Sequence, residues 1–126
     1  MNIYRQKILD HFKNPRNTGE ILNADFCSQL DNPLCGDMIE AFLNVKDSKI
    51  KDIKFKTQGC AIAIAAMSML SEKVKGMSVK QALALDQKDI LNLLGISLSP
   101  ARIKCGMLGL LAIKKCLTQT TGKQAR

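Results

Sequence analysis

The chain has 126 residues, of which 46% are hydrophobic, and a formal net charge of +8 from 19 Lys and Arg against 11 Asp and Glu. This size predicts one domain over residues 1–126, with a core that needs no disulfides. Aromatic residues make up only 4% and Trp is absent, so stacking surfaces are scarce and we expect no nucleic-acid partner. An acidic protein partner explains the positive charge equally well.

No segment predicts a membrane or secretory protein. The longest nearly apolar run, residues 60–70, is shorter than the roughly 20 residues of a membrane-spanning helix. Residues 1–5 contain no apolar stretch behind a basic one, and the five cysteines are an odd number. We therefore expect a reducing, cytoplasmic location.

The amino-terminal part predicts a helix followed by a loop. Apolar residues recur at helical spacing over residues 3–12, before the helix breakers of residues 14–19. Residues 19–33 have the composition of a loop, within which residues 27–30 could add a strand.

The middle of the chain predicts a hairpin and a long helix. Apolar and polar side chains alternate over residues 38–45 and 53–57, on either side of a turn at Asp47-Ser48, so these two segments should pair. Strong helix formers then fill residues 61–75, and Gly76 is placed to end that helix.

Three N-capping signals predict the remaining helices. Each places a Ser or Asp immediately before a run of helix-forming residues. The caps are Ser78, Asp86 and Ser99, and the helices are expected over residues 79–85, 87–94 and 100–115. Residues 118–126 should form a frayed tail.

Three cysteines have settings that favour metal or sulfur chemistry. Cys35 and Asp37 are two residues apart, so an extended backbone points both side chains the same way. Cys60 lies at the start of a predicted helix, where amide N–H groups and the helix dipole favour the thiolate. Cys105 follows Lys104 in the first turns of another helix. Thiolates are soft metal ligands and sulfur nucleophiles, and cytosolic chains seldom use them for stable disulfides.

These three thiolates and one carboxylate could hold zinc, which takes four tetrahedral ligands, or an iron–sulfur cluster. A carboxylate is a harder donor for iron than a fourth thiolate, so the set suits exchange more than permanent binding. The spacing contains no CxxC pair, and burial as a small hydrophobic residue is the alternative for each cysteine. For Cys27 and Cys116 we favour that structural interpretation.

His11 is the only histidine of the chain. We expect it to have a surface or capping role rather than to bind metal. A single histidine excludes zinc-protease motifs and histidine-rich metal sites, and the sequence contains neither a Walker A loop nor GxGxxG.

Motifs along nearly the whole chain resemble one family. They are Tyr4 through Asp10-His11-Phe12 and Asn14-Pro15-Arg16-Asn17, Cys35-Gly36-Asp37, Phe55-Lys56-Thr57-Gln58-Gly59-Cys60, and Lys104-Cys105. They are similar to the iron–sulfur cluster assembly scaffolds IscU and SufU and the amino-terminal domain of NifU. The resemblance implies an α+β, SufE/IscU-like fold, with a small, mainly antiparallel sheet of about three strands covered by helices. It also implies that Cys35, Asp37, Cys60 and Cys105 bind zinc, iron or a [2Fe-2S] cluster.

The sequence departs from both branches of this family. Where IscU has a histidine before its third cysteine, this chain has Lys104, whose ammonium has no lone pair for a metal but could offset thiolate charge. Residues 98–102 read Leu-Ser-Pro-Ala-Arg in place of the Leu-Pro-Pro-Val-Lys chaperone segment, which argues against an IscU-type Hsp70 partner. Residues 32–37 and 100–105 look more like SufU, yet the insertion typical of SufU is absent or much reduced.

The resemblance implies a scaffold that accepts sulfur from a cysteine desulfurase, assembles [2Fe-2S] and passes it to apo iron–sulfur acceptor proteins. Cys105 is the first candidate to receive the persulfide sulfur and Cys35 the second. A zinc-dependent sulfurtransferase that relays sulfur without storing iron is the alternative function. A third hypothesis is an interaction module with structural zinc.

Overall fold

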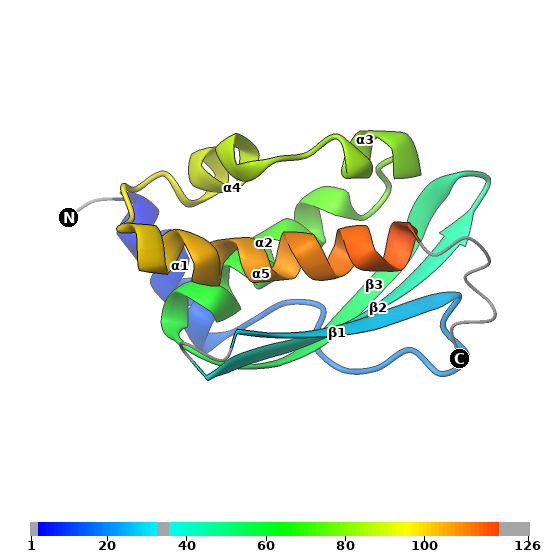
Figure 1. The fold of residues 1–126 in the computed structure, drawn as a ribbon, viewed down its shortest axis with the longest axis horizontal. Helices are drawn as coiled ribbons and strands as arrows, with labels where there is room; N and C mark the ends of the chain where they lie inside the picture. Colours follow the sequence, from blue (N-terminus) through cyan, green and yellow to red (C-terminus); the bar gives the residue numbers. More distant parts are fainter. Residues whose placement is uncertain (1–2, 33–35, 119–126) are drawn as a thin grey trace.

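The computed structural model describes residues 3–32 and 36–118. It confirms the expected α+β fold, with a three-stranded antiparallel sheet in the order β1-β2-β3 (Figure 1). The elements within these residues are α1 (Ile3–Lys13), β1 (Phe26–Asn32), β2 (Asp37–Lys46), β3 (Lys49–Gln58), α2 (Ala61–Val74), α3 (Val79–Leu83), α4 (Gln87–Leu94) and α5 (Pro100–Leu117). No helix in this part of the chain is long and apolar enough to span a membrane.

The helices cover one face of the sheet (Figure 1). α5 lies along β1 and β2, and α2 packs beside α5 and contacts β3. α1 packs against α2, while α3 and α4 lie on the side of α2 and α5 that faces away from the sheet. Side chains at most 1% exposed fill the space between sheet and helices, including Ile39, Ala41, Leu43, Ile53 and Phe55. Burial of such apolar side chains is the main favourable term in folding.

The expected hairpin forms around its predicted turn. β2 and β3 pair from Met38 opposite Gln58 to Lys46 opposite Lys49. The two turn residues between them, Asp47 and Ser48, have positive φ angles of 54° and 63°. A two-residue turn with both φ angles positive matches the right-handed twist of paired strands.

The segment expected as a loop, residues 19–33, contains a full strand. β1 is longer than the candidate strand at residues 27–30, and it pairs antiparallel with β2 along its whole length. The only buried residue of β1 is the polar Ser28. The segment therefore lacks the alternation of apolar and polar residues by which a strand is recognised in a sequence. The Ser28 hydroxyl donates a 2.7 Å hydrogen bond to the carbonyl of Ala112 on α5.

All three N-capping predictions are confirmed. The caps are Ser78 in a capping box with Gln81, Asp86 in a capping box with Asp89, and Ser99 before the proline that opens α5. Each such cap stabilises a helix by about 1 kcal/mol. α3 ends at Leu83 rather than near residue 85. Thr118 is the C-cap of α5, and residues 119–126 of the expected tail lie outside the described residues.

The segment at residues 14–17, which follows α1, forms hydrogen bonds to β3 and α2. Asn17 has a φ angle of 60°, and its carbonyl accepts a 2.9 Å hydrogen bond from the backbone amide of Phe55 in β3. Its side-chain nitrogen donates to Ser71 Oγ in α2 at 2.9 Å. The segment therefore connects the strand that leads to Cys60 with the helix that follows it.

The prediction of a surface or capping role for His11 is wrong. His11 is only 3% exposed, and its Nδ1 lies 2.7 Å from Ser68 Oγ. The same hydroxyl accepts a hydrogen bond from the Arg16 amide. His11 follows the buried Ile8 by three residues, so both lie on the face of α1 that packs against α2. The three-residue spacing from Ile8 therefore indicates in the sequence that His11 lies on the buried face of the helix.

The buried His11 predicts that stability falls in mild acid. Burial is the largest cause that lowers the pKa of His11 and Arg16 adds to it, whereas Glu72 and Asp10 act in the opposite direction. A histidine in an unfolded chain titrates near pH 6.5, so below about that pH the unfolded state binds more protons than the folded state. The free energy of unfolding, fully maintained above about pH 6.5, should decrease as the pH falls through this value towards the lower folded pKa.

Urea unfolding at about pH 7.5 and about pH 5.5 measures this effect. His11→Gln is the matched control, because glutamine keeps hydrogen-bonding groups but does not titrate. The variant should be less stable at the higher pH and lose less stability on acidification than the wild type. Equal losses in both proteins would exclude His11 as the cause.

Candidate metal centre

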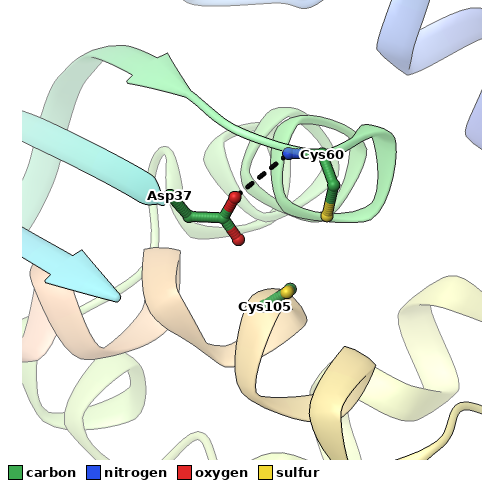
Figure 2. A group of neighbouring side chains, drawn as sticks. All are labelled: Asp37, Cys60 and Cys105. Carbon is green, nitrogen blue, oxygen red and sulfur yellow. Dashed lines mark hydrogen bonds between the residues drawn. The ribbon is translucent and has the colours of Figure 1, made fainter. Parts of the chain in front are cut away.

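Three potential metal ligands from distant parts of the chain converge at one end of the sheet. Asp37 is the first residue of β2, Cys60 is the N-cap of α2, and Cys105 lies in the second turn of α5. One ligand atom from each lies within 4.8 Å of the other two. Figure 2 shows the carboxylate and the two sulfur atoms around a common space. Ligand atoms of tetrahedral zinc with Zn–S bonds near 2.3 Å are roughly 3.8 Å apart, so small side-chain movements would suffice.

The sheet register brings Asp37 next to Cys60. Met38 of β2 pairs with Gln58 of β3, so β2 begins where β3 ends. The chain leaves the sheet after Gln58, passes through Gly59, and starts α2 at Cys60, whose backbone is extended with φ −75° and ψ 167°. The prediction that Cys60 lies at a helix amino terminus is confirmed, although its side chain forms no capping hydrogen bond.

The Asp37 carboxylate is buried and only half satisfied. The residue is 2% exposed, and Oδ1 accepts a 3.2 Å hydrogen bond from the backbone amide of Cys60 (Figure 2). Oδ2 is buried without a hydrogen-bond partner among the described residues. An unsatisfied buried oxygen of a carboxylate is costly, and a bound cation would remove that cost. The donor set therefore fits a metal ion.

Close packing of α5 on α2 brings in the third donor. Cys105 is 2% exposed, whereas Cys60 is half-buried. Four residues after Cys105, a Cβ at Gly109 would lie 2.5 Å from Met67 Sδ of α2. A side chain at Gly109 would require Met67 to move, so the glycine lets α5 pack closely on α2 next to the turn that carries Cys105.

Two predicted site residues are not among these donors. Cys35 lies in the segment 33–35, outside the described residues. Lys104 is exposed and lines a groove of about 500 Å³, together with the apolar side chains of Met107, Leu108 and Leu111 on the same helix.

The other two cysteines lie apart from the three donors. Cys116 is fully buried and its thiol donates to Ser28 Oγ at 3.3 Å, while burial raises the pKa of Cys116 to about 11. Such a thiol stays protonated at neutral pH and is a poor nucleophile, which agrees with the predicted structural role. Cys27 is half-buried in β1.

Sequence reasoning missed one contribution to the site. The side chain of Cys60 is an expected ligand, whereas its backbone amide, the donor that holds Asp37, has no counterpart among the expectations from the sequence. The available signal was Gly59 between a strand and a helix, since glycine in such a junction often marks a close backbone approach.

Comparison with known proteins shows which family the chain belongs to. The chain is 43% identical over 125 residues to the iron–sulfur cluster assembly scaffold protein IscU of Aquifex aeolicus, covering 98% of this chain and 79% of that protein. It is 36% identical over 137 residues to the zinc-dependent sulfurtransferase SufU of Bacillus subtilis, covering 95% of this chain and 92% of that protein. The crystal structure of a NifU-like protein (N-terminal) from Brucella abortus shares the fold, with a TM-score of 0.77 at 19% identity over 93% of each chain. Residues 3–126 match the family described as NifU-like N terminal domain, and the chain belongs to that family.

Proposed function

We propose that this protein is an iron–sulfur cluster assembly scaffold. It receives sulfur from a cysteine desulfurase, binds iron, assembles [2Fe-2S] and passes the cluster to apo acceptor proteins. The observation that carries the proposal is the convergence of Asp37, Cys60 and Cys105 around a buried carboxylate oxygen without a partner in the described part of the chain. The 43% identity to a protein named as an IscU scaffold supports the same function.

The proposed ligands are Cys35, Asp37, Cys60 and Cys105. Three soft thiolates suit iron and zinc, whereas the carboxylate is a harder and more weakly held donor. Cluster transfer requires each bond to the scaffold to be replaced by a bond to the acceptor, and an oxygen donor is the easiest to displace. Asp37 therefore provides the position at which an acceptor thiolate enters.

Zinc fits the same four residues, and when bound it would hold the thiolates deprotonated in the absence of iron. The exposed ammonium of Lys104, next to Cys105 in sequence, adds positive charge that favours thiolates. Thiolates of this kind persist in a reducing compartment, so we assign the protein to the cytoplasm.

Sulfur transfer follows the chemistry of thiol–disulfide exchange. The Cys105 thiolate attacks the outer sulfur of the desulfurase persulfide, the sulfur–sulfur bond breaks, and the desulfurase cysteine leaves as a thiolate. Cys105 then carries the persulfide, and no net electrons are exchanged. Because Cys105 is 2% exposed, this step requires the first turns of α5 to move. Conversion of the transferred sulfur to sulfide takes two electrons per atom from an external electron donor.

The positive charge favours partners with acidic docking surfaces. The net charge of +8 would attract such partners at long range and accelerate their association. The substitution of the chaperone segment at residues 98–102 argues against an IscU-type Hsp70 among them.

Anaerobic reconstitution with iron and sulfide tests the proposed function. A scaffold should take up a cluster with visible sulfur-to-iron charge-transfer absorption, and the cluster should move to an apo-ferredoxin. The alternative is a zinc-dependent sulfurtransferase, favoured by the 36% identity to a protein of that name. A protein with that function would retain zinc, bind iron poorly and still accept sulfur, which would contradict the scaffold function.

The assignment of Cys105 predicts the behaviour of single Cys→Ser variants. Cys105→Ser should lose most of the persulfide that forms after treatment with desulfurase and cysteine, because serine oxygen does not accept sulfane sulfur. Cys116→Ser is the matched control, since its buried, protonated thiol should not react. Mass spectrometry of the alkylated proteins measures the added sulfur. Normal persulfide formation on Cys105→Ser would refute this assignment and leave Cys35 as the candidate.

The exchange function of Asp37 predicts slower cluster release in Asp37→Ala. The variant lacks the oxygen donor that an acceptor thiolate displaces. Transfer to an apo-ferredoxin should therefore slow by about tenfold or more, comparable to the effect of mutating groups that support a metal ligand. The time course of the circular dichroism signal during transfer reports the rate. A faster transfer from the variant would count against this function of the carboxylate.

A further inference from the structure

The residue between β3 and α2 lies unusually close to the Asp37 carboxylate. A Cβ atom at Gly59 would lie 2.6 Å from Asp37 Oδ1, 2.9 Å from Cγ and 3.2 Å from Cβ. Contacts below about 3 Å between these heavy atoms are repulsive, so any larger residue would displace the carboxylate. Asp37 is 2% exposed, so its side chain is enclosed by the residues around it.

A second contact fixes the backbone at the start of β2, where Asp37 lies. Thr57 Oγ1 donates a 2.8 Å hydrogen bond to the carbonyl of Met38, the residue that follows Asp37. Thr57 is paired with Ile39, so this bond adds a side-chain link to the strand ladder. It holds the first residues of β2 against the end of β3, from which Gly59 and Cys60 continue.

These contacts leave one carboxylate oxygen for a ligand. Oδ1 faces Gly59 and accepts from the Cys60 amide, whereas Oδ2 has no partner among the described residues. We propose that Gly59 and Thr57 are positioning residues. They hold the Asp37 carboxylate in an orientation in which only Oδ2 is available to bind the metal. This inference rests on the metal site of the proposed function.

Single-oxygen donation has a chemical consequence. A tetrahedral site takes one donor atom from each of four ligands, whereas a carboxylate that donates both oxygens raises the coordination number. A carboxylate whose second oxygen is already hydrogen-bonded is both oriented and restricted to one bond. Displacement by a methyl group at Gly59 would break the Cys60 hydrogen bond and remove this orientation.

Zinc affinity of the full chain tests the proposal, with competition against a chromophoric chelator as the measurement. Gly59→Ala should weaken zinc binding about 10–100-fold, and Thr57→Val, which keeps the side-chain shape but loses the donor, by several fold. The absorption bands of the cobalt-substituted variants should differ from those of the wild type, because cobalt spectra report the coordination geometry.

Gly106→Ala is the matched control. Gly106 is adjacent to Cys105, but a Cβ there would meet its nearest neighbours, Leu94, Ile90 and Ile62, at ordinary distances of 3.6 to 3.8 Å. This variant should bind zinc within about twofold of the wild type, well below the loss of about tenfold or more expected when a group that orients a metal ligand is changed, because its added methyl group displaces no neighbour. Unfolding of each chelator-treated protein shows whether a variant has lost the fold rather than the site.

A double-mutant cycle separates positioning from a general structural effect. If Gly59 acts through Asp37, Gly59→Ala should cause no further loss of zinc affinity in an Asp37→Ala background. Unchanged affinity in Gly59→Ala and Thr57→Val, or an equal loss with and without the carboxylate, would overturn the proposal. If Gly59→Ala does not fold, the same cycle with Thr57→Val decides.

The outcomes distinguish this proposal from the proposed function. A wild-type protein that binds no zinc or iron would overturn both. A wild-type protein that binds zinc, with the predicted losses in the variants but no cluster on reconstitution, would refute the scaffold function and retain the positioning. Cluster assembly combined with unchanged zinc affinity in the variants would support the scaffold function and refute the positioning role of Gly59 and Thr57.

Discussion

The hydrogen bond from the Cys60 amide to Asp37 Oδ1 is the interaction on which the site depends. It joins the start of β2 to the start of α2, two points that the hairpin register has already brought together. Since it uses one carboxylate oxygen, the other is left buried and without a partner in the described residues. Leaving such an oxygen unsatisfied costs free energy, which a bound cation would remove. Cys105 completes the described part of the centre because α5 packs closely on α2 at Gly109.

Local physics made most of the fold predictable. The turn at Asp47-Ser48, the caps Ser78, Asp86 and Ser99, and the helices that follow them depend on residues adjacent in sequence. β1 and His11 depend on partners distant in sequence. β1 has a mixed pattern and is defined by its pairing with β2, and His11 is buried because α1 packs on α2. Propensity alone could not reveal either feature, although the spacing of His11 from Ile8 was a clue.

The site was predictable in kind but not in arrangement. Asp37, Cys60 and Cys105 could be chosen as donors from their chemistry and from the resemblance of their motifs, and the structure brings these three together. Their spacing of 23 and 45 residues contains no information about distance in space, because only the sheet register and helix packing set it. The two Asp37 oxygens differ because the Cys60 amide donates to Oδ1 and because Gly59 has no side chain to displace the carboxylate. Residue types alone do not reveal these backbone contacts.

The central claim is that three thiolates and one Asp37 oxygen form a single metal site. X-ray absorption spectroscopy of the zinc-loaded protein tests it most directly, because the scattering shells of sulfur and oxygen can be separated by distance. A site of this composition should show three sulfur ligands at about 2.3 Å and one oxygen at about 2.0 Å. A spectrum dominated by nitrogen and oxygen, with at most one sulfur, would contradict it.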